Sequence, residues 1–192
     1  MKPVVLVTGA AGLIGQYLLK TAPRWAPQWE VRGITRQEVD LTDAGAVRRL
    51  WRDLHPHVVV HCAAQSRTGP CQRDPAMARR INVEATSILA ELAAEIPFLF
   101  FSSDQVFDGS KGWYVETDPV HPVNVYGETK VEAELFVLQN PRHSVIRVAL
   151  NAGNSPTGDR SFVEDMRNSV KDGTSLTLFT DEFRCPLPAG MT

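Results

Sequence analysis

The stretch Val4-Val-Leu-Val-Thr-Gly-Ala-Ala-Gly-Leu-Ile-Gly15 determines the fold class that the sequence predicts. It consists of a short β-branched run, a turn with three glycines and the beginning of a helical pattern. Strand, glycine turn and helix in this order form a phosphate cradle, because glycine lets the backbone approach a pyrophosphate and a helix start offers free N–H groups. We therefore expect a dinucleotide site, although an ordinary glycine-rich turn has the same local pattern. The residues expected to contact the cofactor here are Gly9, Gly12, Leu13, Ile14 and Gly15.

Strand and helix patterns alternate along the chain as far as residue 149. Short apolar strands are expected at residues 4–8, 30–35, 58–62, 98–102 and 144–149, and helices at 13–21, 44–54, 75–94 and 123–138. Strands that are apolar throughout are buried on both faces, which is typical of a doubly wound parallel sheet. The sequence therefore predicts an α/β, Rossmann-like fold with the strand order 3-2-1-4-5. Further along, a helix at 162–171 and a strand at 175–179 are expected.

Tyr126 and Lys130 are separated by one helical turn in the expected helix 123–138. Positions i and i+4 share a helix face, so a phenol and an ammonium project into one site. The ammonium is expected to stabilise the phenolate and to lower the tyrosine pKa from about 10 toward the working pH, where a general acid is most effective. With Ser103 at the end of an apolar run, the pair predicts a proton-transfer site.

Two longer motifs give the chain a family resemblance: Ser102-Ser-Asp-Gln-Val-Phe-Asp-Gly109 and Pro122-Val-Asn-Val-Tyr-Gly-Glu-Thr-Lys130. Together with the G-x-x-G-x-x-G turn, they resemble the extended short-chain dehydrogenase/reductases, and within these the dTDP-4-dehydrorhamnose reductase family. The resemblance implies NAD(P)H-dependent reduction of the 4-keto group of a nucleotide deoxysugar, converting dTDP-4-dehydrorhamnose to dTDP-rhamnose. A nucleotide sugar is then the expected substrate.

The same resemblance assigns catalytic roles to Ser103, Tyr126 and Lys130. Tyr126 donates the proton, Lys130 holds the nicotinamide ribose and lowers the Tyr126 pKa, and Ser103 donates a hydrogen bond to the substrate oxygen. Ser102 competes with Ser103 for the last role. Gln105 stands where the family commonly carries tyrosine, so the sugar pocket is expected to lack that aromatic surface.

Cofactor choice is expected to depend on the end of the second strand, where an arginine accepts the 2′-phosphate of NADP and an acid holds the ribose of NAD. Arg36 favours NADP, unless it is only a solvated charge at the strand end. Glu38 is the alternative that would allow NAD. By resemblance, the other residues beside the cofactor are Asp40, Leu41, Ala63, Ala64 and Gln65, together with Tyr126 and Lys130. Asn82 matches a structural and proton-relay asparagine of the superfamily, or else it only packs its helix.

Composition limits the classes of partner that we expect. Twenty basic and 22 acidic residues leave a formal charge of −2, and no basic block favours nucleic acid or an anionic membrane. No apolar stretch approaches the roughly 20 residues of a membrane helix, so we expect a cytoplasmic protein. A homodimer is a possible assembly. Neither nucleic acid nor a membrane is an expected partner.

The cysteines and histidines are expected to have no metal-binding role. Cys62, Cys71 and Cys185 are too few and too irregularly spaced for a zinc site or a disulfide framework, so they are expected to be free thiols. His57 and His61 flank the apolar run at residues 58–60, which indicates polar ends of a buried strand. We therefore expect no metal.

The C-terminal part of the chain is expected to be an incomplete substrate region. In the extended reductases the substrate half is built largely from residues beyond this point, so residues 1–150 are expected to bind NAD(P) and residues 151–192 to begin a truncated substrate-binding region. The 192 residues alone are then expected to bind cofactor and to turn over the sugar poorly. Trp113 and Tyr114, between the two motifs, either pack on a substrate base or pin their loop to the domain.

Two other functions are compatible with the sequence. The non-catalytic regulatory subunit of methionine adenosyltransferase shares the expected fold and nearly the same central motif. A sugar-nucleotide epimerase or dehydratase would use the same tyrosine with tightly bound NAD. The sequence therefore leaves a dinucleotide-binding regulatory module and an epimerase or dehydratase open beside the reductase.

Overall fold

A five-stranded parallel sheet forms the centre of the computed structural model, which describes residues 2–192. Neighbouring strands pair in the order β2-β1-β3-β4-β5, and every pair is parallel. The strands are β1 (Val4–Thr8), β2 (Glu30–Ile34), β3 (Val58–His61), β4 (Phe98–Ser103) and β5 (His143–Val148). The predicted α/β, Rossmann-like doubly wound fold is confirmed.

The strand order differs from the expected 3-2-1-4-5, which was wrong. β3 pairs directly with β1, on the side opposite β2, so β2 is an edge strand. The side chains explain this order, because Glu30 and Arg32 on β2 are charged and exposed, which an edge strand tolerates. β3 carries Val58, Val59 and Val60, and a strand that is apolar on both faces belongs inside a sheet.

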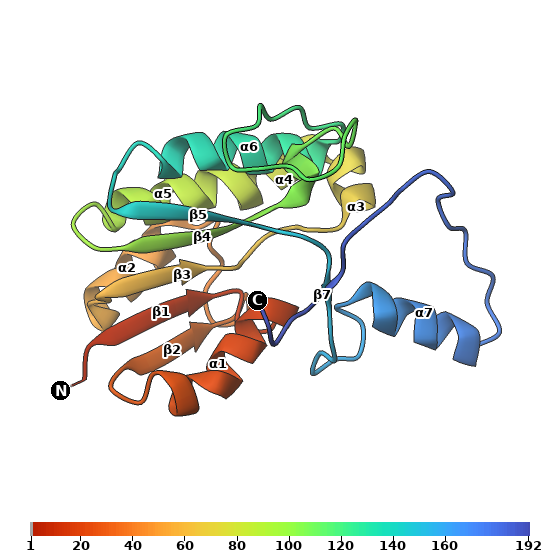
Figure 1. Ribbon diagram of the computed structural model, residues 1–192. Helices are drawn as coiled ribbons and strands as arrows, with labels where there is room; N and C mark the ends of the chain where they lie inside the picture. The colour runs from red at the N-terminus through yellow and green to blue at the C-terminus, as the bar shows by residue number, and fades with distance from the viewer. Residues whose placement is uncertain (1) are drawn as a thin grey trace.

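Helices cover the two faces of the sheet unequally (Figure 1). Helices α2 (Ala44–Leu54), α5 (Ala85–Leu92) and α6 (Val125–Val137) pack together on one face. Helix α1 (Leu13–Trp25) lies on the other face, where Leu19 contacts the β2 glycine Gly33. This arrangement is that of a doubly wound sheet.

One expected helix, at residues 75–94, is interrupted. It consists of α4 (Pro75–Arg79), a π-helical turn η1 (Arg80–Glu84) and α5, and it is preceded by a short helix α3 (Thr68–Arg73) that the sequence pattern did not predict. Asp74 caps α4 by accepting a hydrogen bond from the Met77 N–H, and Pro75 occupies the first turn. A π-helical turn often marks a functional site.

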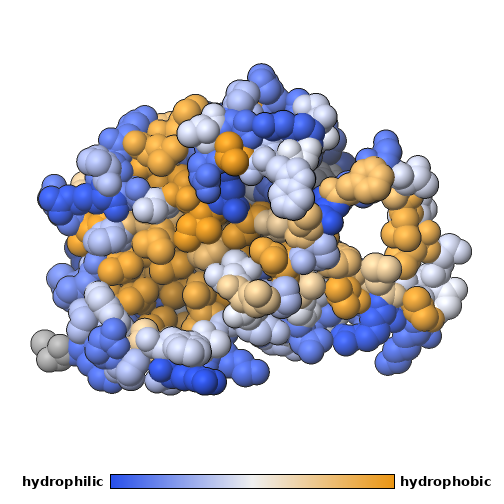
Figure 2. Space-filling model, in the orientation of Figure 1, coloured by the Kyte–Doolittle hydropathy of each residue, from blue (hydrophilic) through white to orange (hydrophobic). Residues whose placement is uncertain are grey.

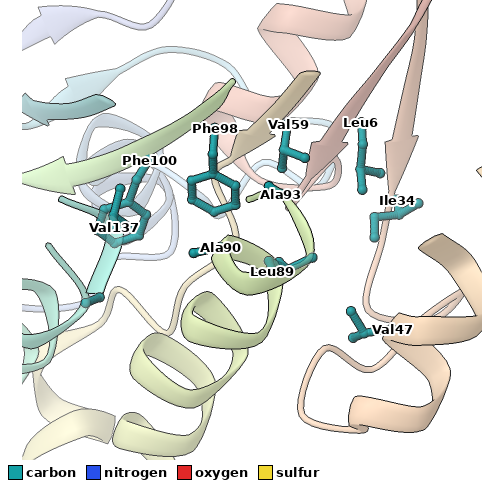
Figure 3. Close-up of a cluster of buried hydrophobic side chains, with 11 residues drawn as sticks. Leu6, Ile34, Val47, Val59, Leu89, Ala90, Ala93, Phe98, Phe100 and Val137 are labelled. Atoms are coloured by element: carbon teal, nitrogen blue, oxygen red, sulfur yellow. The ribbon is translucent and has the colours of Figure 1, made fainter. Parts of the chain in front are cut away.

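The main core lies between the sheet and helices α2, α5 and α6 (Figure 3). Leu6, Val59 and Phe98 come from adjacent strands and are fully buried against Leu89 and Ala93 of α5 and its C-terminal end. Burial of one large apolar side chain contributes roughly 1.5–3 kcal/mol. This core therefore fixes the strands whose C-terminal ends carry the site.

The opposite face of the sheet is only partly covered. Alternation along the strands places Val60, Leu99 and Ile146 on the side away from the main core, where they remain half-buried. Figure 2 shows apolar side chains gathered on the face turned to the viewer, and Figure 1 shows no helix in front of β4 and β5 in that view.

The remainder of the chain forms a small second unit of regular structure. Strand β6 (Asn151–Ala152) pairs in parallel with β7 (Leu187–Pro188), and helix α7 (Phe162–Lys171) lies between them in sequence. The helix matches the prediction, but the strand expected at 175–179 was wrong. Leu178 and Phe179 are exposed and form no ladder, because an apolar run becomes a strand only when a sheet edge is available to pair with it.

None of the helices within residues 2–192 is both long enough and apolar enough to cross a membrane.

Candidate functional site

A cleft of about 370 Å³ opens at the C-terminal ends of β1, β2 and β3. β1 pairs with β2 on one side and with β3 on the other, so the chain reverses its direction of winding at this point. Ligands of doubly wound sheets bind at such switch points. Eight of the expected cofactor residues line the cleft together: Gly9, Gly12, Arg36, Asp40, Leu41, Ala63, Ala64 and Gln65.

The glycine turn is packed tightly against the loop that follows β3. Gly9 has a positive φ of 69°, and a Cβ there would lie 2.7 Å from the Ala63 backbone nitrogen. A Cβ on Gly15 would lie 2.4 Å from the Gly9 carbonyl oxygen, so helix α1 also approaches the turn closely. Gly12 is the N-cap of α1, whereas Leu13, Ile14 and Gly15 lie within the helix and do not line the cleft.

The end of β2 presents an arginine rather than an acid to the cleft. Arg36 is exposed and lines the cleft. The Glu38 carboxylate turns back and accepts hydrogen bonds from the N–H and hydroxyl of Thr35, both at 2.8 Å, and these bonds lower the pKa of Glu38. Because the Glu38 carboxylate is already bound by Thr35, Arg36 is the charged group that the end of β2 presents to the cleft.

Ser103, Tyr126 and Lys130 come together beside β4, outside the lining of the cleft. Tyr126 and Lys130 lie one turn apart on α6, as the spacing predicted, and both side chains are buried. The Ser103 hydroxyl faces the Tyr126 hydroxyl and favours its ionised form, whereas the buried Ser102 Oγ has no hydrogen-bond partner within residues 2–192. The arrangement favours Ser103 over Ser102 as the neighbour of the tyrosine.

The electrostatics of this group differ from the expectation that Lys130 lowers the Tyr126 pKa. Burial raises the pKa of Tyr126 to about 12, and Ser103 offsets only part of this rise. Lys130 Nζ instead donates a hydrogen bond of 2.7 Å to the Phe101 carbonyl and lies 3.9 Å from the centroid of the Phe100 ring. Burial lowers the pKa of Lys130 to about 7. The expected phenolate–ammonium coupling is absent here, because the amine points toward the β4 backbone.

Gly127 allows α6 to approach the turn that follows β4. A Cβ at this position would lie 2.2 Å from the Gln105 carbonyl oxygen, a backbone atom that cannot move freely. Asn124, the N-cap of α6, stabilises this approach. Its Oδ1 accepts a hydrogen bond from the Gly127 N–H, and its Nδ2 donates one to the Gln105 side chain. Gly127 therefore lets the first turn of α6, which carries Tyr126, pack against the turn that follows Ser103.

Replacing Gly127 with alanine is expected to lower the free energy of unfolding by about 1–3 kcal/mol, the usual cost of overpacking. Urea unfolding measures the loss. Gly112→Ala is the matched control, because nothing lies within 4 Å of a Cβ there, and it should change stability little. Equal stabilities for the two variants would contradict the close approach.

His61 is part of a buried chain of hydrogen bonds, in which the donor and the acceptor of each bond can be assigned. The Thr86 hydroxyl donates to the Asn82 carbonyl at 2.7 Å, so its oxygen accepts from His61 Nε2 at 2.9 Å. His61 Nδ1 then accepts from the Thr8 hydroxyl at 2.6 Å, and Thr8 Oγ1 accepts from the Ala63 N–H at 3.3 Å. His61 is therefore neutral, with its proton on Nε2, and it joins the cleft loop to α5.

Burial, with a smaller contribution from the Lys130 charge, lowers the pKa of His61 to about 3. The unfolded chain binds this proton below about pH 6.5, whereas the folded protein does not, so stability is lost as the pH falls. We expect His61 to account for a loss of about 2 kcal/mol in the free energy of unfolding between about pH 7 and 5. Denaturant titrations at several pH values measure it.

His61→Gln should weaken this pH dependence, whereas His57→Gln, at an exposed imidazole, should retain it. Identical pH profiles for the protein and its His61→Gln variant would show that His61 does not stay neutral.

Asn82 lies in the π-helical turn and connects the cleft loop with α6. Its Oδ1 accepts from the Gln65 N–H at 2.8 Å, and its Nδ2 donates to the Gln65 carbonyl and to Thr129 Oγ1. The wider turn of η1 places this side chain between the two elements. Asn82 thus holds the loop that lines the cleft and the helix that carries Tyr126.

The loop between the two sequence motifs is pinned by its tyrosine. Tyr114 stacks on Phe107 with ring centroids 4.2 Å apart, and its hydroxyl donates to Asp108 at 2.6 Å. Trp113 is almost fully exposed, with a positive φ of 57°. Of the two expected roles, Tyr114 therefore has that of pinning its loop to the domain. Trp113 does not line the cleft, and its side chain is exposed.

Two arginines of the C-terminal part reach the site without having been predicted as site residues. Arg160 lines the cleft. Arg184 makes a bidentate ion pair with Asp104, with Nη2 at 2.8 and 2.9 Å from the two carboxylate oxygens. Both act across long sequence separations, so no local pattern could reveal them. Cys62, Cys71 and Cys185 are free thiols.

Comparison with known proteins identifies the family. The model of the RmlD substrate binding domain matches residues 1–191 of this chain. The chain belongs to the RmlD substrate binding domain family. The predicted resemblance to the dTDP-4-dehydrorhamnose reductases is thereby confirmed.

Similar curated proteins include a reductase and a subunit of a methionine adenosyltransferase. A dTDP-4-dehydrorhamnose reductase of Burkholderia thailandensis is 38% identical over 191 residues, covering 95% of this chain and 60% of its own length. The methionine adenosyltransferase 2 subunit beta of Bos taurus is 36% identical over 177 residues, covering 87% of this chain and 52% of its own length. This RmlD chain therefore spans only about half to three fifths of these curated relatives.

A solved structure supports the same fold. The dTDP-4-dehydrorhamnose reductase of Bacillus anthracis, in complex with NADP, matches with a TM-score of 0.80 at 25% identity, covering 90% of this chain and 61% of that chain. The Rossmann-like arrangement of this RmlD family member is therefore shared with a structure that contains a dinucleotide.

Proposed function

We propose that the cleft binds a nicotinamide dinucleotide, with NADP preferred over NAD. The observation that carries this proposal is the meeting of the glycine turn, Arg36 and the loop at residues 63–65 around one cleft at the switch point of the sheet. Their chemistry fits the ligand, because backbone N–H groups at a helix start suit a pyrophosphate and a free guanidinium suits a 2′-phosphate. The NADP complex of the Bacillus anthracis relative supports the proposal.

We further propose that the protein reduces the 4-keto group of a nucleotide deoxysugar such as dTDP-4-dehydrorhamnose. A reduced nicotinamide supplies a hydride when it is bound. Tyr126 would donate its hydroxyl proton to the carbonyl oxygen, and Ser103 would donate a hydrogen bond to the same oxygen as charge develops there. Lys130 is assigned the ribose contact. The reductase relatives support this reaction class.

We also propose the division that the sequence suggested, with the dinucleotide site in residues 1–150 and the start of the substrate-binding region in residues 151–192. The Arg184–Asp104 ion pair supports it, because it brings the second region next to Ser103. Asp104 and Arg184 also act on Tyr126 with opposite charges. The C-terminal region thus reaches the proposed reaction centre.

A regulatory module is the second candidate, and a specific observation favours it. Lys130 donates to the Phe101 carbonyl, and burial raises the pKa of Tyr126 to about 12, which is the opposite of the lowering by Lys130 that the reductase hypothesis predicts. The similarity to the methionine adenosyltransferase 2 subunit beta supports this candidate. A protein of this kind would bind the dinucleotide and regulate a partner enzyme.

Mass spectrometry of nucleotides that co-purify with the protein separates these functions. NADP together with a deoxysugar nucleotide is the result expected for the reductase. Firmly retained NAD would instead favour an epimerase or dehydratase. NADP without a sugar nucleotide, combined with no turnover of any deoxysugar nucleotide, would favour the regulatory module.

A further inference from the structure

Arg160 gives the cleft a second arginine, from a part of the chain far from the glycine turn. Three charged residues line the cleft: Arg36, Asp40 and Arg160. The Asp40 carboxylate is held locally, because its Oδ1 accepts from the Thr42 N–H at 2.9 Å and the Thr42 hydroxyl at 2.8 Å. The two guanidinium groups are therefore the charged groups of the lining that are suited to an anionic ligand.

Residues 153–164, which we call the strap, carry Arg160 in a fixed backbone conformation. The Glu164 carboxylate is buried and accepts hydrogen bonds from the N–H groups of Ser155, Arg160 and Ser161 at 2.5, 3.0 and 3.1 Å. Ser161 completes a capping box with Glu164 and donates its hydroxyl proton to the Gly153 carbonyl at 2.7 Å. The backbone of Arg160 is thus held from both sides.

The strap lies against the first turn of α1, beside the glycine turn. Gln16 Nε2 donates to the Asn154 carbonyl at 2.7 Å, and Gly153 lies against Tyr17. The strap joins the end of the sheet to α7 on the side where α1 begins (Figure 1). The pyrophosphate of a dinucleotide binds at this helix start in doubly wound folds. Arg160 therefore stands on the pyrophosphate side of the cleft, whereas Arg36 stands at the end of β2.

The Arg160 guanidinium makes only weak contacts within the protein, so it is available to bind a ligand. Its Nε lies 3.3 Å from Asp159 Oδ1 and 3.3 Å from Thr157 Oγ1, and about half of the side chain is exposed. Within residues 2–192, its two Nη atoms have no hydrogen-bond partner. Because an exposed ion pair contributes little to stability, exchanging it for a diphosphate costs little.

We propose that Arg160 binds the pyrophosphate of the dinucleotide and that this contact further stabilises the strap beside the bound ligand. This inference rests on the proposed dinucleotide site and adds a residue that acts on NADP and NAD alike. Arg36, in contrast, distinguishes the two by the 2′-phosphate. The two arginines therefore have separable effects on affinity.

Calorimetric titration of the full chain with NADPH and with NADH tests the assignment. Arg160→Gln is expected to raise the dissociation constants of both dinucleotides by about tenfold, because a charge-assisted hydrogen bond is lost. Their ratio should stay within about twofold. Arg160→Lys should retain part of the affinity, and Arg142→Gln, which removes an exposed charge at the opposite edge of the sheet, should leave both constants unchanged. In hydrogen exchange, NADPH should slow the strap amides.

Three results would overturn the inference. Unchanged constants for Arg160→Gln would remove Arg160 from the ligand. A loss of NADPH affinity alone would show that it binds the 2′-phosphate instead. Unaltered exchange of the strap on ligand binding would show that the strap is not part of the site. If the unmodified protein binds neither dinucleotide, the proposed function fails together with this inference, whereas the other results leave that function intact.

Discussion

Replacing Tyr126 with phenylalanine is expected to lower kcat for a 4-keto nucleotide sugar by about 10²- to 10⁴-fold, the usual contribution of a general acid. The change removes one hydroxyl group and keeps the packing of the ring against Cys71 and Ala78. The dissociation constant of the dinucleotide should therefore change little. Steady-state kinetics of NADPH consumption, with calorimetry of NADPH binding, measures both quantities.

The matched control for this prediction is Tyr114→Phe. It removes a hydroxyl that donates to Asp108 in the loop outside the reaction centre, so kcat should fall far less. Turnover that survives Tyr126→Phe would refute the catalytic assignment. If the unmodified protein binds NADPH but turns over no deoxysugar nucleotide, the regulatory module becomes the better account.

Replacing Arg36 with alanine is expected to raise the dissociation constant of NADPH by about ten- to hundredfold, because a charge-assisted contact to the 2′-phosphate is lost. The constant for NADH, which lacks this phosphate, should stay within about twofold. Calorimetric titrations with both dinucleotides measure the effect. Arg32→Ala is the control, because Arg32 is exposed on β2, does not line the cleft and pairs with Glu30.

An unchanged NADPH affinity in Arg36→Ala would mean that Arg36 is only a solvated charge at the strand end. An equal loss of affinity for NADPH and NADH would assign it to a part common to both dinucleotides. Either result would remove the basis for the proposed NADP preference.

Elements of the fold that depend on local pattern were predictable. The apolar runs at β1, β3 and β4 form strands close to the expected residues, since each run has a composition that only a buried strand accommodates. The strand order was predicted wrongly, because the apolar pattern of a strand does not specify which strand it pairs with. The charges of Glu30 and Arg32, however, were a visible sign of an edge strand.

The interrupted helix shows a second limit of pattern reading. Residues 75–94 have the composition of one helix, but the hydrogen bonds of Arg80–Glu84 follow the wider π spacing. Tertiary contacts of Asn82 with Gln65 and Thr129 accompany this widening. Contacts of this kind join distant parts of the chain, so the composition of the segment does not specify them.

The candidate site also contains residues whose positions were predictable from the sequence and residues whose positions were not. Residues of the glycine turn and Arg36 follow strands directly, so their meeting in one cleft could be predicted from the order of elements. The direction of Lys130 depends on the β4 backbone and on Phe100, and it was not predictable from the i, i+4 spacing. Arg160 is placed by long-range contacts of the strap, although the Ser161 and Glu164 capping box is readable in the sequence.

Calorimetric titration of the unmodified 192-residue chain with NADPH and NADH shows whether the cleft is a dinucleotide site at all. We expect one NADPH bound per chain, with an affinity about tenfold or more above that for NADH, in keeping with the charge-assisted contact assigned to Arg36. The absence of binding by either dinucleotide would contradict the proposed site. Equal affinities would contradict the role of Arg36.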